Sequence, residues 1–402
     1  MHPIRKITGL AARLAVGVAQ KPNLLHLALF GAMWLASPEV VEAQFLFKTN
    51  HGSITITGYR GKPTTLSIPS TTNGYTVTAI GSEAFESCTS LTTVTIPNSV
   101  TNFGDEAFFD CANLTGLTIH SSVTSIGGGA FEYCASLTNV TIPDSVTSLG
   151  YAAFANCYSL TNVTIDSELN SLGDDMFEEN ASLISVTIPN RVTNIGMNAF
   201  FNCNSLISVT IPQSVISIES GAFVNCSSLT SITIPNRVTS IGQSVFDSCS
   251  SLTNVTLGTD VTSLGTNAFE FCTSLATVYF TGNSPTPTND PSVFFSVSLY
   301  GISVTVYYLP GTTGWGSTFD GVPAVLWNPQ VQTSHASFGV QSNQFGFTIA
   351  GTTNIPVVVE ACPNLGGAWT QVQSVSLTNG SLYFSDPQWT NYPSRFYRLS
   401  MP

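Results

Sequence analysis

One pattern of hydrophobic and polar positions returns along most of the chain at an interval of 23 residues. Phenylalanine and leucine each recur nine times without a slip. The phenylalanines are Phe85, Phe108, Phe131, Phe154, Phe177, Phe200, Phe223, Phe246 and Phe269, and the leucines are Leu91, Leu114, Leu137, Leu160, Leu183, Leu206, Leu229, Leu252 and Leu275. One turn of this length cannot bury its own apolar side, whereas stacked turns share a continuous core. The pattern therefore predicts a solenoid of nine 23-residue turns over residues 76–280.

The first part of each repeat has the spacing of a helix. Ile80, Ala84, Phe85 and Cys88 fall on one face at intervals of three and four residues, which is typical of a short amphipathic helix. A glycine begins this segment in each repeat except one, where Glu219 replaces it. We expect a backbone position there that tolerates a side chain poorly.

The second part of each repeat alternates like a strand. Val94 and Ile96 are apolar and Thr93 and Thr95 are polar, so the first pair is expected to point inward and the second outward. Pro97 and the prolines at the same position of later repeats end the strand, because proline cannot donate a ladder hydrogen bond. The predicted fold class is therefore an α/β solenoid with one short strand and one short helix in each turn.

The consensus Ile-Pro-x-x-Val-Thr-x-Ile-Gly-x-x-Ala-Phe-x-x-Cys-x-Ser-Leu resembles the BspA-like leucine-rich repeats of bacterial surface proteins over about residues 68–280. Residues 44–75 are similar to the N-terminal cap of that family. The resemblance implies an exported or cell-surface binding protein, with several members described as adhesins. It implies no catalytic residue, and it carries no ligand-binding residue to this chain because the shared motif is the core.

The outward strand positions form the predicted partner-binding site. They are Thr95, Thr118, Thr141, Thr164, Thr187, Thr210, Thr233, Thr256 and, in the last repeat, Tyr279. On a leucine-rich-repeat arc such strands line the concave side, where extended partners dock. Two alternatives stay open: threonine is also an ordinary solvent-facing strand residue, and hydroxyl ladders can order water for ice binding.

Eight of the nine cysteines occupy one column of the repeat, and Asn180 takes the place of the missing one. A disulfide ladder is one interpretation in an exported chain. The favoured interpretation is a column of buried thiols that share weak hydrogen bonds with loop backbone, because asparagine can replace them. Cys362 lies outside the column.

Charge and motif content narrow the function. The formal net charge is −12, with only 8% charged residues, so a nucleic-acid partner is not expected. No pattern for a nucleophile with its base, a phosphate loop or a cofactor is present, and we predict no enzyme, no cofactor and no metal. The acidic residues Asp174, Asp175, Glu178 and Glu179 favour a solvated surface over a calcium site. Arg191 is expected to neutralise neighbouring acids.

The two ends of the chain depart from the repeat. Residues 1–43 combine four basic residues with an apolar run at 24–36, which predicts a signal peptide and no membrane insertion of the mature chain. Residues 281–328 are predicted to cap the solenoid, with Trp315, Phe319 and Trp327 as plugs.

Residues 329–402 alternate like strands between Gly, Pro and Asn turns and predict a small all-β sandwich. Its aromatic residues Trp369, Trp389, Tyr392 and Tyr397 are expected to form its core. The alternative is that they stack on sugar rings.

The predicted function is a secreted or cell-surface, adhesin-like protein that binds a protein or polysaccharide through the concave repeat face. The alternative is a structural envelope or matrix protein that self-associates. The sequence identifies neither the partner nor the mode of surface attachment.

Overall fold

The computed structural model describes residues 44–402 except 167, 286–291 and 295–300. The predicted signal peptide at residues 1–43 lies outside the described residues. Residues 44–402 form one compact unit of strands and a single short 3₁₀ helix, η1 (Trp389–Asn391). Within the described part of the chain, no helix is long and apolar enough to cross a membrane.

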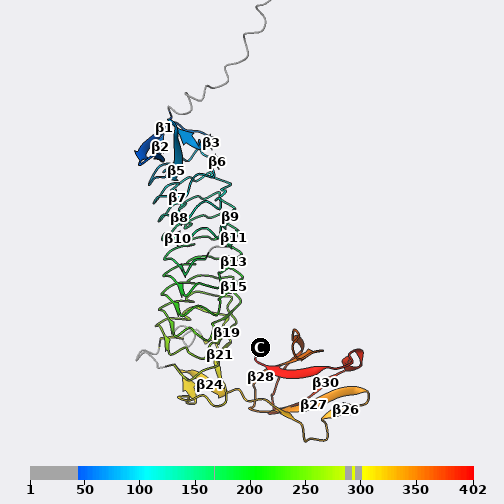
Figure 1. The fold of residues 1–402 in the computed structure, drawn as a ribbon. Helices are drawn as coiled ribbons and strands as arrows, with labels where there is room; N and C mark the ends of the chain where they lie inside the picture. The colour runs from blue at the N-terminus through cyan, green and yellow to red at the C-terminus, as the bar shows by residue number, and fades with distance from the viewer. Residues whose placement is uncertain (1–43, 167, 286–291, 295–300) are drawn as a thin grey trace, which may run out of the picture. The chain divides into compact units, whose positions relative to one another are not determined.

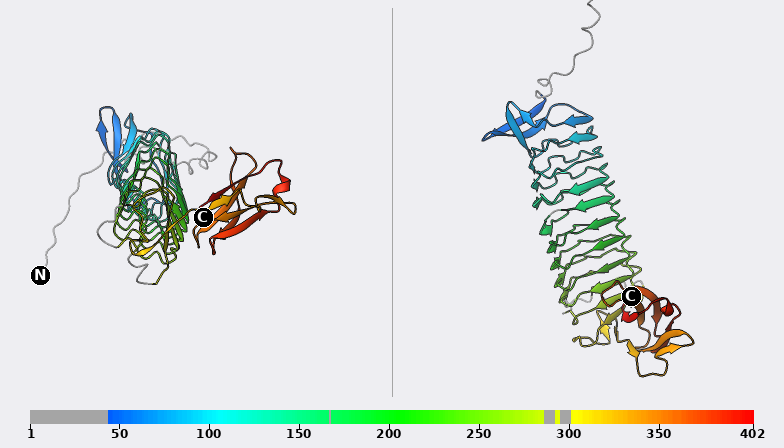
Figure 2. Two further views of the ribbon diagram at one scale, coloured as in Figure 1. Left: turned by 90° about the horizontal axis from the view of Figure 1, so that it is seen from below. Right: turned by 45° about the vertical axis from the view of Figure 1, so that its right-hand side comes forward.

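The predicted strand is confirmed in every repeat except the one after Leu114, where residues 117–119 form no strand, and the entry segment adds one more strand, β3 (Thr65–Ser67). These strands are β3, β6 (Thr93–Thr95), β9 (Asn139–Ile142), β11 (Asn162–Ile165), β13 (Ser185–Thr187), β15 (Ser208–Thr210), β17 (Ser231–Thr233), β19 (Asn254–Leu257) and β21 (Thr277–Phe280). Within three separate sheets they pair in parallel so that equivalent residues of successive repeats lie opposite one another, as Thr141 does with Thr164. Figure 1 and the right-hand view of Figure 2 show these strands one above another along the stack.

A second set of parallel strands, not predicted, runs along another side of the solenoid. It contains β5 (Tyr75–Ile80), β7 (Asn102–Phe103), β8 (Ser125–Ile126), β10 (Ser148–Leu149), β12 (Ser171–Leu172), β14 (Asn194–Ile195), β16 (Ser217–Ile218), β18 (Ser240–Ile241) and β20 (Ser263–Leu264). Most have only two residues, and each points one apolar side chain inward, such as Ile195, which is fully buried.

The predicted helix of each repeat is wrong. Residues 81–88 form successive tight turns, and the backbone adopts positive φ at Glu83 (57°) and Ser87 (51°). Alternate N–H groups leave the segment: the Glu83 N–H donates to Asp105 O of the next turn, whereas the Glu86 N–H donates to Glu83 O. A helix would satisfy its N–H groups within itself. The fold is therefore an all-β solenoid.

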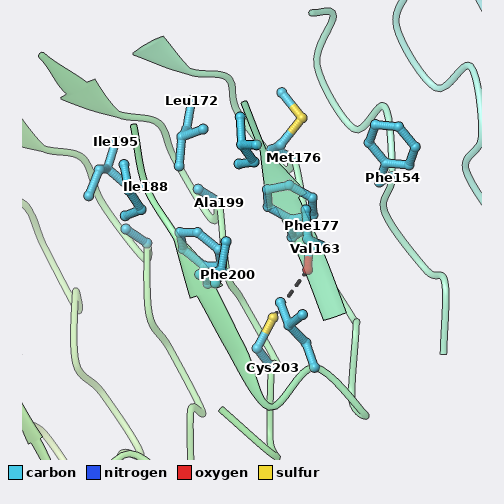
Figure 3. Close-up of a cluster of buried hydrophobic side chains, with 14 of the residues drawn as sticks. Phe154, Val163, Leu172, Met176, Phe177, Ile188, Ile195, Ala199, Phe200 and Cys203 are labelled. Atoms are coloured by element: carbon cyan, nitrogen blue, oxygen red, sulfur yellow. Dashed lines mark hydrogen bonds between the residues drawn. The ribbon is translucent and has the colours of Figure 1, made fainter. Parts of the chain in front are cut away.

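The core of the solenoid is a column of stacked phenylalanine rings. Successive rings from Phe85 to Phe269 lie 4.9 to 6.3 Å apart between centroids. Phe294 extends the column past the last predicted repeat, 5.5 Å from Phe269, which makes ten rings and about ten turns. Figure 3 shows Phe154, Phe177 and Phe200 with the aliphatic side chains around them. All three are inaccessible to solvent.

The repeat glycine is explained by the close stacking of turns. A Cβ at Gly242 would lie 2.5 Å from the Ser220 N atom of the preceding turn, and one at Gly150 would lie 2.3 Å from Gly128 N. No side chain fits at these two positions without backbone movement, whereas at Gly173 the nearest atom is the flexible Met176 Cε at 3.3 Å and Glu219 occupies the column in one turn. The prediction of a restricted position is confirmed, although it begins a turn and not a helix.

The ends of the solenoid are covered. At the N-terminal end, β1 (Phe45–Asn50) and β2 (Ser53–Tyr59) form a hairpin beside β5, and β4 (Thr71–Thr72) also pairs with β5. At the other end, β22 (Thr305–Tyr308) and β24 (Val322–Leu326) continue the parallel sheet from β21, and β23 (Thr318–Phe319) turns back on β24. Trp315 and Phe319 pack on Phe280, as predicted for plugs.

The C-terminal residues form two small antiparallel sheets. One contains β25 (Gln330–Gln332), β26 (Gly339–Gln341), β27 (Gln344–Ala350) and β30 (Ser381–Asp386), and the other contains β28 (Pro356–Cys362), β29 (Thr370–Ser376) and β31 (Phe396–Ser400). Their inner faces share one buried cluster, which includes Phe347 and Phe384 from the first sheet and Val357 and Val359 from the second. Residues 329–402 thus form a C-terminal β region of two sheets around one cluster. Of the four aromatic residues expected in its core, Tyr397 packs against the cluster, whereas Trp369, Trp389 and Tyr392 do not belong to it and Tyr392 is 39% exposed.

Candidate partner-binding face

The outward threonines of the first strand set define a surface that we name the Thr face: Thr95, Thr118, Thr141, Thr164, Thr187, Thr210, Thr233 and Thr256. The first seven are exposed and Thr256 is half-buried. Their positions are fixed because the flanking residues point inward: Val186 and Ile188, on either side of Thr187, are 5% and 3% exposed. The surface is polar, rich in hydroxyl groups and almost free of charge.

Tyr279 does not belong to the Thr face, and its prediction as an exposed partner-binding residue is wrong. Its side chain is 1% exposed and its ring stacks on Tyr307 of β22 with 5.4 Å between centroids. Both rings join the cluster that contains Trp327 and Phe347. Trp327 therefore packs in this second cluster, where its indole N–H donates to Pro356 O at 2.7 Å. Burial raises the pKa of Tyr279 to about 12.

The ladder beneath the Thr face is interrupted twice. Among the described strands, β15 pairs with β13 but not with β17, and β17 begins a new sheet with β19. A hollow of about 340 Å³ lies at this break, lined by residues of β15 and β17 with Gln213 and Pro235. A second hollow of about 220 Å³ lies beside β9, where residues 117–119 form no strand. At the larger hollow, β15 and β17 face each other without a ladder of paired residues between them.

Two exposed isoleucines stand directly before strands of the Thr face. Ile184 and Ile207 directly precede β13 and β15, and their side chains are 45% and 51% exposed. They lie in adjacent turns, since the Ile207 N–H donates to Ile184 O at 3.1 Å. Six other turns have a threonine in this column and the last has Ala276; four of the threonine hydroxyls donate to the preceding turn, as Thr253 does to Thr230 O. The isoleucines replace that hydrogen bond with exposed hydrocarbon.

The cysteine column has the arrangement that was favoured from the sequence. From Cys111 onward each column thiol donates to the carbonyl of a phenylalanine in the preceding turn, at 3.0 to 3.4 Å; Figure 3 shows the bond from Cys203 to Phe177 O. Asn180 Nδ2 donates to Phe154 O at 2.9 Å in the same way. All nine cysteines are free thiols, and burial raises the pKa of Cys157 to about 12.

The acidic cluster is engaged with neighbouring polar groups. Asp174 accepts a hydrogen bond from Met197 N at 2.8 Å, and Glu179 accepts one from Asn202 Nδ2 at 2.6 Å. Burial, followed by the charges of Asp175 and Glu179, raises the pKa of Glu178. Within the described residues, no three His, Cys, Asp or Glu side chains gather as metal ligands.

Basic residues are few on the solenoid. Arg191 forms an exposed ion pair with Glu168 in the preceding turn, as expected for a residue that neutralises neighbouring acids. His120, in the column where other repeats have proline, places its ring nitrogen 2.8 Å from Ile96 O. Each of these side chains has a structural partner.

Fold and surface together define a parallel β-solenoid of leucine-rich repeats with one exposed, hydroxyl-rich strand face. The chain matches the model of the BspA type leucine rich repeat region in six copies, over residues 62–184 and 172–289. These ranges cover more than half of the chain, which belongs to this family. No curated protein matches it.

Several solved structures are similar. A leucine-rich repeat protein from Bacteroides ovatus shares 23% identity over 71% of this chain and 98% of its own, with a TM-score of 0.44. A leucine rich cell surface protein from Faecalibacterium prausnitzii shares 25% identity over 60% and 94%, with a TM-score of 0.31. The T. pallidum leucine rich repeat protein shares 29% identity over 52% and 88%, with a TM-score of 0.40.

Proposed function

We propose that this chain is an exported, surface-associated binding protein that recognises an extended protein or polysaccharide partner through the Thr face. Export rests on the basic and apolar segments of residues 1–43. A repeat solenoid suits this role because it presents one surface over many turns without needing a catalytic centre.

The observation that carries the proposal is the interruption of the Thr face between β15 and β17. A strand edge without ladder pairing offers backbone donors and acceptors, the hollow beside it holds about 340 Å³, and exposed Ile184 and Ile207, directly before β13 and β15, supply apolar contact. Apolar contact combined with a few convergent polar groups is the chemistry of ligand recognition. We therefore propose a binding centre around β13, β15 and β17.

The test replaces Thr187 and Thr210 with lysine in the mature chain and measures binding to an array of matrix proteins and polysaccharides. Both side chains are exposed, so the fold is expected to persist while two long cations cover the face. A matched control carries lysine at Thr89 and Gln243, which are exposed on the turn side of the solenoid. Loss of saturable binding only in the Thr-face variant supports the proposal, and equal binding by both variants rejects it.

The second candidate is a structural protein whose solenoids pack against one another. The break in the ladder between β15 and β17 favours it, because unpaired strand edges also pair with other copies of a chain. Light scattering of the purified mature chain distinguishes the two. Assembly that grows with concentration, and that disappears in the Thr187→Lys, Thr210→Lys variant, supports self-association in place of partner binding.

A further inference from the structure

A buried arginine–aspartate pair lies in the C-terminal module, away from the Thr face. Asp386 ends β30 with its side chain 1% exposed, and the Arg395 side chain is 9% exposed. The Arg395 Nε atom lies 2.8 Å from Asp386 Oδ2. Nearly complete burial of two charges is costly unless their remaining hydrogen-bonding capacity is used.

Asp386 uses its capacity within the module. Its Oδ2 atom accepts a hydrogen bond from the Tyr397 hydroxyl at 2.8 Å, and its Oδ1 atom accepts one from Gln388 N at 2.8 Å. Burial and the hydrogen bond to Asp386 raise the pKa of Tyr397, so this hydroxyl stays a donor at neutral pH. The carboxylate is therefore saturated by the protein.

Arg395 uses only part of its capacity. Its guanidinium lies against the Tyr392 ring, with 4.2 Å from Cζ to the ring centroid, and a side-chain hydrogen bond with Tyr397 partly offsets the rise in the pKa of that hydroxyl. Among the described residues, no further acceptor is bonded to its two terminal nitrogens. Those nitrogens carry four N–H groups in a planar fork that matches a carboxylate. The aspartate and the tyrosine ring hold the fork in one orientation.

The arginine lines a hollow of about 310 Å³. The other walls include Thr370 and Gln371 from β29 and Gln388 and Tyr392 from the segment after β30. Amide and hydroxyl groups both donate and accept hydrogen bonds, as sugar hydroxyls require, and Tyr392 keeps 39% of its surface exposed for ring contact. The size of the hollow is at the lower end of the range for small-ligand sites.

Charge favours an anionic ligand here and not on the solenoid. Residues 329–402 contain two arginines and two acids, a formal charge of zero, whereas the whole chain carries −12. Asp386 also lines the hollow, and its carboxylate is paired with Arg395, so an anion there meets no local excess of negative charge.

We propose that the C-terminal module binds an acidic saccharide in this hollow, with the sugar carboxylate on the Arg395 fork and the ring hydroxyls on Gln371, Gln388 and Thr370. This site is independent of the Thr face. It differs from the aromatic platform considered from the sequence, because Trp389 and Tyr397 bond within the module: the Trp389 indole donates to Asn343 O and the Tyr397 hydroxyl to Asp386.

The chain contains a matched control for Arg395. Arg398, three residues later, also pairs with a carboxylate, Glu360, and stacks on an aromatic ring, Trp369. Its side chain is 49% exposed and does not line the hollow. If binding depends only on net charge or on the stability of the module, substitution of either arginine weakens it. If binding depends on the hollow, only substitution of Arg395 weakens it.

The experiment is isothermal titration of the intact mature chain with trigalacturonate and with trimannuronate at low ionic strength. We expect saturable binding of at least one, weakened about tenfold or more by Arg395→Lys, which keeps the charge and loses the fork, and unchanged by Arg398→Lys. Gln371→Glu, an exposed change that cannot unfold the module through its core, is expected to weaken binding as strongly by placing a carboxylate in the hollow. The Thr187→Lys, Thr210→Lys variant is expected to bind normally.

Three results would overturn the proposal. The first is no saturable binding of either uronate by the unmodified chain. The second is equal affinity for the methyl ester of the same trisaccharide, because the ester lacks the charge that the fork would hold. The third is equal loss in the Arg395→Lys and Arg398→Lys variants. Acetate binding as tight as that of the trisaccharide would also reject the saccharide part.

Discussion

Asn180 offers a sharp test of how the turns are held together, because it is the one departure from the cysteine column. Its side chain is fully buried. The amide Nδ2 donates to Phe154 O at 2.9 Å, and Oδ1 accepts from Cys157 N at 2.8 Å. Asn180→Ala leaves both backbone groups buried without a partner. At about 1–3 kcal/mol for each unmet group, the expected loss of unfolding free energy is roughly 2–6 kcal/mol.

Asn180→Cys is the matched control, since it restores the residue of every neighbouring turn. The new thiol is expected to donate to Phe154 O, and the Cys157 N–H to return to that same carbonyl, as the Cys157 thiol and the Cys134 N–H share Phe131 O. The expected loss is below about 1 kcal/mol.

Urea unfolding of the reduced chain, followed by circular dichroism, ranks the three proteins. Hydrogen exchange of a peptide that covers residues 150–160 gives a local readout, because a long repeat array can unfold in parts. An alanine variant as stable as the unmodified chain, or a cysteine variant less stable than the alanine variant, would refute this reasoning.

Two further predictions concern the core and the glycine column. Burial raises the pKa of Cys111 and Cys157 to about 12, so the folded chain holds these protons to a higher pH than the unfolded chain does. The contribution of the protonated thiols to the free energy of unfolding is complete at neutral pH and is expected to fall from about pH 8.5 upward. Urea midpoints at rising pH measure the fall, and a constant midpoint up to the range where tyrosine ionises would contradict it. Gly242→Ala is expected to destabilise the chain because its Cβ would lie 2.5 Å from Ser220 N, whereas Gly116→Ala, with open space around it, is expected to change the stability little. Thermal unfolding compares the two variants, and equal midpoint temperatures would reject the close-stacking explanation.

The strands of the Thr face follow directly from the sequence, because alternation of inward Val or Ile with outward Thr has the strand period of two. The turn segments do not. The spacing of Ala84, Phe85 and Cys88 is the same in a helix and in successive tight turns. The two structures differ in the positive φ angles of Glu83 and Ser87. Glutamate and serine do not indicate positive φ in a sequence, whereas glycine would.

Other features depend on contacts that a repeat pattern cannot contain. Tyr279 stands where threonine is exposed in the other turns, yet it is buried by Tyr307, Trp327 and a module that follows later in the chain. The break between β15 and β17 is invisible because their sequences, SVT and SIT, are those of paired strands elsewhere. The exposed Ile184 and Ile207, by contrast, could be predicted from the sequence, because isoleucine replaces threonine there in an exposed column of the repeat.

The central claim is that the Thr face around β13, β15 and β17 contacts the partner, and hydroxyl-radical footprinting tests it most directly. The mature chain is oxidised alone and with whichever array component it binds, and the oxidised side chains are located by mass spectrometry. Ile184 and Ile207, the exposed residues directly before β13 and β15, report on the strand side of the solenoid, while Tyr151 and Met197, 60% and 49% exposed, report on the turn side. The account predicts protection of the two isoleucines with unchanged oxidation of Tyr151 and Met197. Protection of Tyr151 and Met197 with the isoleucines still oxidised would contradict it.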